Sequence, residues 1–118
     1  MPYRRLLEAI VRFVPGAEGA ILLDSEGEVV VEAGPQRDFR HRLIGAYQGI
    51  ALKTALRTGA RYGTGAVDAM LCRYDQGTLI LRPLKDGYYF VVALRPEASV
   101  AEAMWRTDAV RDRMNEEL

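Results

Sequence analysis

The segment from Phe39 to Arg57 most constrains the fold, because its pattern predicts a helix with two apolar faces. At about 100° per residue, one stripe has the apolar spacing typical of a helix that covers a core, and it consists of Phe39, Leu43, Tyr47, Ile50 and Thr54. The opposite line is small and apolar, and it consists of Gly45, Gly49, Leu52, Ala55 and Leu56.

A glycine inside a helix costs about 1 kcal/mol relative to alanine, so two at Gly-x-x-x-Gly spacing indicate close packing. We therefore expect the first stripe to cover a sheet. The line that begins at Gly45 and Gly49 is expected to meet the same helix of a second copy. The helix predicts a homodimer.

Length and composition exclude several classes of protein. The 118 residues, of which 49% are hydrophobic, predict a single domain over residues 1–118 with an ordinary core. The 16 basic and 16 acidic residues balance, so no positive surplus indicates a nucleic-acid or anionic membrane partner. A lone Cys72, with no leader and no apolar run long enough to span a bilayer, predicts a cytoplasmic protein.

Turn and capping residues divide the chain into eight elements in the order αββαβββα. The first helix is expected to end at Pro15-Gly16, and a Ser99-x-x-Glu102 capping box is expected to open the last. Gly59 is expected to end the middle helix. The five strands are predicted at Gly19 to Asp24, Glu28 to Ala33, Gly63 to Tyr74, Thr78 to Pro83 and Tyr88 to Leu94.

The strand patterns also predict how the layers stack. Strands one, four and five are almost continuously apolar, which is typical of strands with both faces buried. We therefore expect an α/β (α+β) fold, a three-layer α/β/α sandwich whose five-stranded antiparallel sheet has the middle helix on one face. Strands two and three become the edges.

The third strand lacks the charges that normally protect an edge, since Asp68 is the only charge between Thr64 and Cys72. We expect this edge to pair with its twofold mate, which also brings the two middle helices side by side. The predicted dimer interface comprises Gly45, Gly49, Leu52, Leu56, Thr64, Ala66, Asp68 and Met70.

Two short motifs resemble a known family. Pro15-Gly16-Ala17-Glu18-Gly19-Ala20 is similar to the "PG-x-x-GA" entry of Roadblock/LC7 domains, and Asp24-Ser25-Glu26-Gly27 is similar to their "D-x-x-G" hairpin. The element order follows the family over nearly the whole chain. The resemblance implies a profilin-like fold that dimerises through the middle helix and third strand. It also implies a small Ras-like GTPase as partner, as in bacterial gliding and polarity regulators, or a scaffold role, as in dynein light chains and lysosomal adaptors.

The residues that carry chemistry favour a protein that is not an enzyme and holds no cofactor or metal. His41 is the only histidine and is expected on a solvated helix surface. Cys72 lies in a predicted strand without a neighbouring histidine or a C-x-x-C motif. Gly63-x-Gly65 is too short to be a phosphate-binding loop, so we do not expect the chain to bind a nucleotide by itself.

Basic residues that flank the middle helix are the candidate partner-binding residues, namely Arg37, Arg42 and Lys53. In a twofold dimer they would frame the helix pair and face an acidic patch of a GTPase. Trp105 is either an exposed binding anchor or, as we expect, packed against the first helix near Tyr3 or Leu7. Three functions remain open: a GTPase regulator or activating partner, a scaffold dimer, and a small-molecule sensor of the PAS or GAF type.

Overall fold

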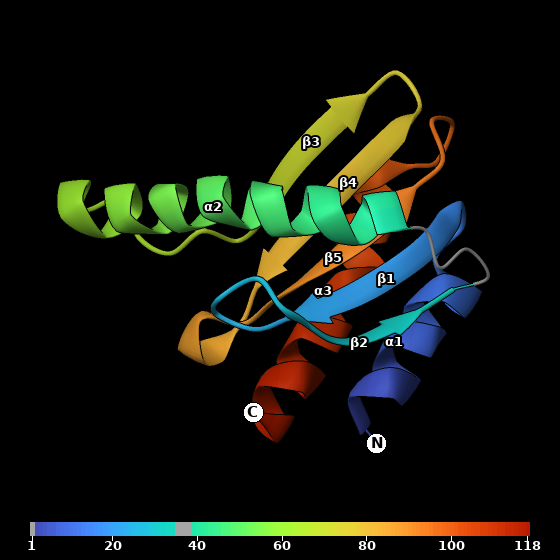
Figure 1. Cartoon of the computed structure of the whole chain (residues 1–118), viewed down its shortest axis with the longest axis horizontal. Coiled ribbons are helices and arrows are strands. Elements are labelled where there is room, and N and C mark those ends of the chain that lie inside the picture. The colour runs from blue at the N-terminus through green and yellow to red at the C-terminus, as the bar shows by residue number, and fades with distance from the viewer. Residues whose placement is uncertain (1, 35–38) are drawn as a thin grey trace.

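The structure, a computed structural model, describes the backbone of residues 2–34 and 39–118 and the side chains of residues 2–34 and 44–118. The predicted order αββαβββα is confirmed, with one short 3-10 helix added (Figure 1). The elements are α1 (Pro2–Phe13), β1 (Ala17–Leu23), β2 (Val29–Ala33), α2 (Phe39–Tyr62), β3 (Met70–Tyr74), β4 (Gly77–Pro83), η1 (Lys85–Gly87), β5 (Tyr89–Leu94) and α3 (Val100–Glu117).

The five strands form one antiparallel sheet in the order β2-β1-β5-β4-β3. The predicted centre (β1, β4 and β5) and the predicted edges (β2 and β3) are therefore confirmed. Figure 1 shows α2 lying across one face of the sheet, with α1 and α3 side by side on the other face. The α/β/α sandwich is confirmed, and each face of the sheet has its own apolar core.

On the face of α1 and α3, alternate strand residues such as Leu22, Ile80 and Phe90 pack against Leu7 and Met114 of the two helices. On the face of α2, the intervening residues Leu23, Leu81, Tyr89 and Val91 pack against Leu52. The alternation follows from the twofold period of a strand, and it explains why these strands read as unbroken apolar runs.

Two local predictions are confirmed in atomic detail. The Asp24 carboxylate accepts hydrogen bonds from the backbone N–H groups of Glu26 and Glu28, at 2.9 and 3.0 Å, and Gly27 supplies a φ of +83°. The Ser99 hydroxyl oxygen accepts a hydrogen bond from the backbone N–H of Glu102 at 3.1 Å, as a helix cap requires. Short polar side chains thus start the β1–β2 hairpin and α3.

Two predicted boundaries are wrong. The middle helix continues through Gly59 to Tyr62, because Gly59 lies against the following chain; a Cβ there would lie 2.5 Å from the carbonyl oxygen of Gly65. The third strand begins only at Met70. Gly63 and Gly65 adopt φ values of +73° and +91°, which are incompatible with a strand. The segment of residues 63–69 therefore runs back alongside the end of α2 before the sheet resumes.

Candidate functional site

Helix α2 lies on the sheet through its glycine line. Leu52 is buried in the core beneath the helix, and Gly49 lies directly over the ring of Tyr89. A Cβ added at Gly49 would overlap the hydroxyl oxygen of Tyr89 and lie 2.6 Å from its Cζ, whereas one at Gly45 would lie 3.5 Å from Cγ2 of Val91, which is ordinary contact. The Tyr89 hydroxyl donates a hydrogen bond to the carbonyl oxygen of Gly45 at 3.2 Å.

The roles predicted for the two faces of α2 are therefore wrong, and the structure interchanges them. Gly45, Gly49 and Leu52 face the sheet, and Leu56 packs against the same core, so this line is not available to a second copy. The physical reason is Tyr89, a large buried side chain on the central strand β5. Its ring fits under α2 only where the helix has no side chain.

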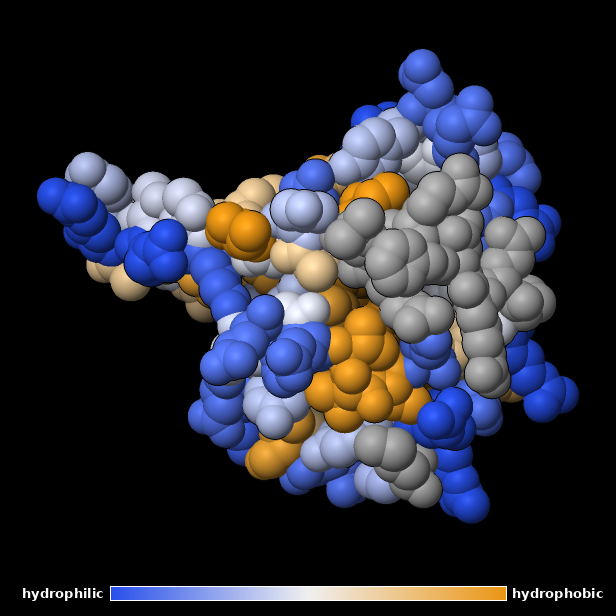
Figure 2. Space-filling model, in the orientation of Figure 1, coloured by the Kyte–Doolittle hydropathy of each residue, from blue (hydrophilic) through white to orange (hydrophobic). Residues whose placement is uncertain are grey.

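The described residues of the other apolar stripe of α2 face outward. Tyr47 and Ile50 are 64% and 65% exposed, and Thr54 is also exposed. In Figure 2, apolar atoms interrupt the hydrophilic outer side of α2, whereas the C-terminal end of the helix is hydrophilic. The prediction of two apolar faces is thus correct, although the expected core-facing stripe is the one that meets solvent.

Helix α2 is tied to the edge strand of the sheet. Within the described residues, β3 pairs only with β4, and its Tyr74 is 45% exposed. Gln48 of α2 donates a hydrogen bond to the Tyr74 hydroxyl oxygen at 3.0 Å, which ties the helix to this strand. We call Tyr47, Ile50, Thr54, Tyr74 and the outer edge of β3 the α2/β3 surface.

The interface residues predicted from the third strand are largely displaced. Thr64 and Ala66 are exposed but lie before the strand, and only Met70 belongs to β3, half-buried under α2. The Asp68 carboxylate accepts hydrogen bonds from Arg82 of β4 and Arg111 of α3. The predicted edge is therefore shorter than expected.

Arg82 is a buried charged residue that the sequence analysis did not single out. Its side chain is fully buried on the α1/α3 face of β4, where it donates to the Thr107 hydroxyl at 2.8 Å and the Asp108 carboxylate at 2.7 Å. It also donates to the Asp68 carboxylate at 3.2 Å. The hydrogen bond from Arg82 holds the pKa of Asp108 below its usual range. Its signal in the sequence was a charge two residues after Ile80, on the core-facing side of an apolar strand.

Of the predicted partner-binding residues, Lys53 is the one whose side chain the structure describes. Arg37 lies outside the described residues, as do the side chains of Arg42 and His41. Lys53 lies half-buried on α2. Cys72 is half-buried in β3, and burial raises the pKa of its thiol, which disfavours the reactive thiolate.

Two other features are absent from the described part of the chain. No group of three or more His, Cys, Asp or Glu side chains there is arranged to hold a metal ion. None of the helices there is long and apolar enough to cross a membrane.

A five-stranded antiparallel sheet between one long helix and a pair of terminal helices defines a profilin-like domain. Its arrangement is that of the Roadblock/LC7 domain, so the fold implied by the sequence motifs is confirmed. No protein-family model and no curated protein matches the sequence.

The chain is similar to a Roadblock/LC7 domain from Streptomyces avermitilis, with 21% identity, a TM-score of 0.83, and coverage of 97% of this chain and 95% of that one. It is similar to Myxococcus xanthus MglB, with 11% identity, a TM-score of 0.85, and coverage of 99% and 94%. Profilin IB of Acanthamoeba castellanii is more distant, with 10% identity, a TM-score of 0.64, and coverage of 98% of each chain. These similarities establish the fold.

Proposed function

We propose that the chain forms a homodimer through its α2/β3 surface and that this dimer regulates a small Ras-like GTPase. The observation that carries the proposal is an exposed apolar stripe on α2 together with a strand edge, that of β3, which pairs with no further strand among the described residues. Each of these features is normally covered in a soluble protein. The similarity to MglB, described in another solved structure as a gliding protein, gives the proposal its functional direction.

A twofold axis beside β3 covers both features at once. The β3 strands of two copies pair edge to edge, so the backbone groups at the edge gain hydrogen-bonding partners. The two α2 helices then lie side by side, and Tyr47 and Ile50 of one copy contact those of its partner. This dimer uses the stripe that faces outward, whereas the one expected from the sequence used the glycine line.

The paired helices offer a surface to the GTPase. Lys53 lies on α2 between the outward stripe and the sheet, and Arg57 follows one turn later with its side chain exposed. Cations at these positions complement an acidic patch on a partner and accelerate its association. Binding there regulates the partner by holding its switch segments in one conformation, which alters hydrolysis or nucleotide release.

Self-association is tested with Ile50→Glu, which places a charge at the centre of the outward stripe without disturbing the core. Analytical ultracentrifugation is expected to show a dimer for the parent chain and a monomer for the variant. Trp105→Glu is the matched control, since Trp105 is 70% exposed on the opposite face of the sheet. A parent chain that sediments as a monomer, or an Ile50→Glu variant that remains dimeric, would contradict the proposed interface.

Regulation is tested with the Ras-like GTPase encoded nearest to this gene. Single-turnover GTP hydrolysis and release of a fluorescent nucleotide are measured with the parent chain, with Ile50→Glu and with Lys53→Glu. We expect the parent chain to change one of the two rates, and each variant to reduce the effect. If the chain does not bind the GTPase, the proposed partner is wrong.

A scaffold dimer is the second candidate, and the same exposed surface favours it. It predicts a stable complex with the partner but unchanged hydrolysis and nucleotide release, so the experiment above separates the two. The sensor alternative has less support, because apolar side chains fill the space between α2 and the sheet, among them Leu52, Leu81 and Tyr89. Two surface hollows lie on the outer side of α1 and α3.

A further inference from the structure

The connector of residues 63–69, which joins the end of α2 to the start of β3, is mostly exposed. Its first four residues are exposed, and no described atom lies within 4 Å of a Cβ built on either of its glycines. The backbone N–H of Thr64 donates to the carbonyl oxygen of Gly59 at 3.0 Å, which fixes the end beside α2. The other end is fixed at Asp68, two residues before β3 begins.

Asp68 accepts three hydrogen bonds from two arginines. Its carbonyl oxygen accepts from Nε of Arg82 at 3.2 Å, and its carboxylate accepts from Nη2 of Arg82 at 3.2 Å and from Nη1 of Arg111 at 2.5 Å. Arg82 belongs to β4 and Arg111 to α3. We call Asp68, Arg82 and Arg111 the Asp68 network. It ties the connector to the sheet and to α3 at a single residue.

Both arginines are held in place without the Asp68 carboxylate. The fully buried Arg82 also donates to the Asp108 carboxylate at 2.7 Å, and Arg111 also donates to the Asp112 carboxylate at 3.3 Å. Each arginine therefore keeps an acidic partner when the Asp68 carboxylate is removed. The role of Asp68 can thus be tested without leaving a buried charge unpaired.

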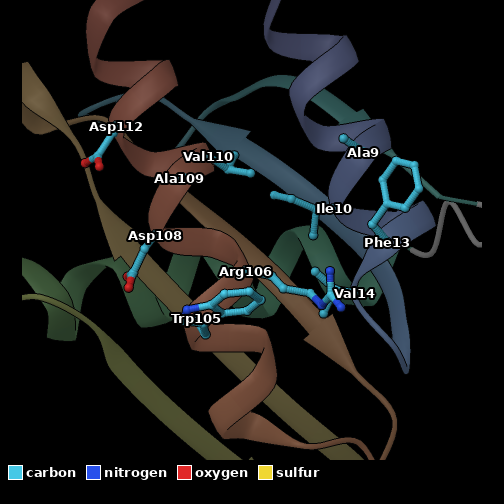
Figure 3. Close-up of a pocket in the computed structure, with 10 residues that line it drawn as sticks. All are labelled: Ala9, Ile10, Phe13, Val14, Trp105, Arg106, Asp108, Ala109, Val110 and Asp112. Atoms are coloured by element: carbon cyan, nitrogen blue, oxygen red, sulfur yellow. The ribbon is translucent and has the colours of Figure 1, made fainter.

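Figure 3 shows the α3 side of the network, beside the groove between α1 and α3 that Trp105 lines. Asp108 and Asp112 lie one turn apart on the same side of the helix. Trp105, in the turn before Asp108, is 70% exposed, so the expectation that it packs near Tyr3 or Leu7 is wrong. The acidic partners that the two arginines keep therefore lie together on α3.

The network takes the place of the next residue pair of the sheet. Met70 lies opposite Leu81 in the last pair of β3 and β4, so Ala69 would next lie opposite Arg82. Instead, the Arg82 guanidinium holds the preceding residue, Asp68, by its backbone and its side chain. Strand β3 has only five residues, so the position at which it starts determines much of the edge that it offers.

We propose that Asp68 is a positioning residue for self-association, because it fixes the start of β3 where the strand offers its edge to a second copy. This inference rests on the homodimer proposed above. The Asp68 carboxylate bonds to two arginines of its own chain, so it acts through β3. Without these bonds the connector must be ordered when the dimer forms, and the ordering of a loop weakens association. A dimer contains two connectors, so the loss occurs twice.

The test compares Asp68→Ala with Asp112→Ala, a matched control. Both carboxylates accept a hydrogen bond from Arg111, and their side chains are 65% and 69% exposed, but only Asp68 belongs to the connector. Sedimentation of the full chain over a range of concentrations gives the dissociation constant of the dimer. We expect Asp68→Ala to raise this constant at least about fivefold, and Asp112→Ala to leave it within about twofold of the parent value.

Amide hydrogen exchange locates the effect. It is measured by mass spectrometry in the Ile50→Glu background, where association does not contribute. Asp68→Ala is expected to accelerate exchange at least about fivefold in peptides that cover residues 67–72, and to leave β1 and β5 unchanged. A residue that only stabilised the whole fold would accelerate exchange in every strand. The pattern therefore separates positioning from general stability.

Three results would each overturn the role of Asp68 while the dimer stands: a dissociation constant that Asp68→Ala leaves unchanged or lowers, equal effects of Asp68→Ala and Asp112→Ala, or unchanged exchange at residues 67–72. A parent chain that sediments as a monomer would overturn the proposed dimer, and the role of Asp68 with it. The two failures are distinguishable, because Ile50→Glu tests the dimer and Asp68→Ala tests the start of β3.

Discussion

Replacing either glycine of α2 by alanine gives a sharp test of how the helix lies on the sheet. In an exposed helix, glycine to alanine stabilises a protein by up to about 1 kcal/mol. Gly45 and Gly49 are one turn apart on the same face, so the stabilisation that alanine gives through its higher helix propensity is nearly equal at both positions. The two variants therefore differ only in what the new methyl group contacts.

At Gly45 the methyl group finds room, 3.5 Å from Cγ2 of Val91, so Gly45→Ala is expected to raise the free energy of unfolding by up to about 1 kcal/mol. At Gly49 the methyl group overlaps the hydroxyl oxygen of the buried Tyr89 first, and then its ring, at 2.6 Å from Cζ and 3.2 Å from Cε1. Overpacking of this kind costs roughly 1–3 kcal/mol, and a strained or broken bond from Tyr89 to Gly45 adds about 1 kcal/mol. After the propensity gain is subtracted, Gly49→Ala is expected to lose roughly 1–3 kcal/mol.

The assay is equilibrium unfolding in urea, followed by far-ultraviolet circular dichroism at one fixed protein concentration, because association would shift the midpoint. In a thermal scan, each 1 kcal/mol change in the free energy of unfolding shifts the melting temperature by roughly 3–6 °C for a chain of this size. The double variant Gly49→Ala with Tyr89→Phe tests the mechanism. It is expected to recover part of the loss, because the hydroxyl is removed while the ring remains.

The decisive result is that Gly45→Ala raises the free energy of unfolding and Gly49→Ala lowers it. Equal effects at the two glycines, or a Gly49→Ala variant more stable than the parent chain, would refute the placement of Tyr89 beneath Gly49. If both variants kept their stability but altered sedimentation, the glycine line would face a second copy, as first expected from the sequence.

Three further predictions concern Arg82 and the start of α3. The double variant Asp68→Ala with Asp108→Ala is expected to lose roughly 2–3 kcal/mol in urea unfolding because it strands a buried charge, although exposure of both carboxylates to water moderates the effect. Arg82→Met is expected to lose less unfolding free energy than the double variant. A larger loss in Arg82→Met would contradict this account. The pKa of Asp108 is lowered in the folded state, so its contribution is complete above the ordinary value of 3.8 and is lost as the pH falls through the lower folded value. Asp108→Asn should therefore flatten the decline of unfolding free energy at acidic pH, and an unchanged acid profile would exclude this role. Ser99→Ala is expected to cost about 1 kcal/mol in the same assay, and Ser99→Asp to restore most of it.

Much of the fold could be predicted because it depends on signals that are local in the chain. The hairpin turn is determined by Asp24 and Gly27, and the start of α3 by Ser99, within a few residues of each site. The strand order followed from runs such as Leu79 to Leu81, since strands buried on both faces must lie in the centre. Where a local signal competed with a contact to the next segment of the chain, as at Gly59 beside Gly65, the prediction was wrong.

The candidate site was predicted less completely. The sequence indicated that α2 has two apolar faces and that β3 is an edge, but it did not show which face of the helix is covered. It raised Trp105 as a possible anchor but not the groove beside it, because that groove needs α1 placed against α3. It also did not identify Arg82, whose partners Asp68 and Asp108 come from segments on either side of it in the chain.

The sequence by itself therefore determined the elements, their order in the sheet and the presence of two apolar stripes on α2. Helical periodicity measures how apolar a face is, and the two faces of α2 are nearly alike in this respect. Only the tertiary structure decided between them, because the choice depends on shape. The ring of Tyr89 projects from the central strand and fits against Gly49. Its hydroxyl donates a hydrogen bond to the carbonyl oxygen of Gly45, one turn earlier in α2. That fit turns Tyr47 and Ile50 outward and leaves them free to meet a partner.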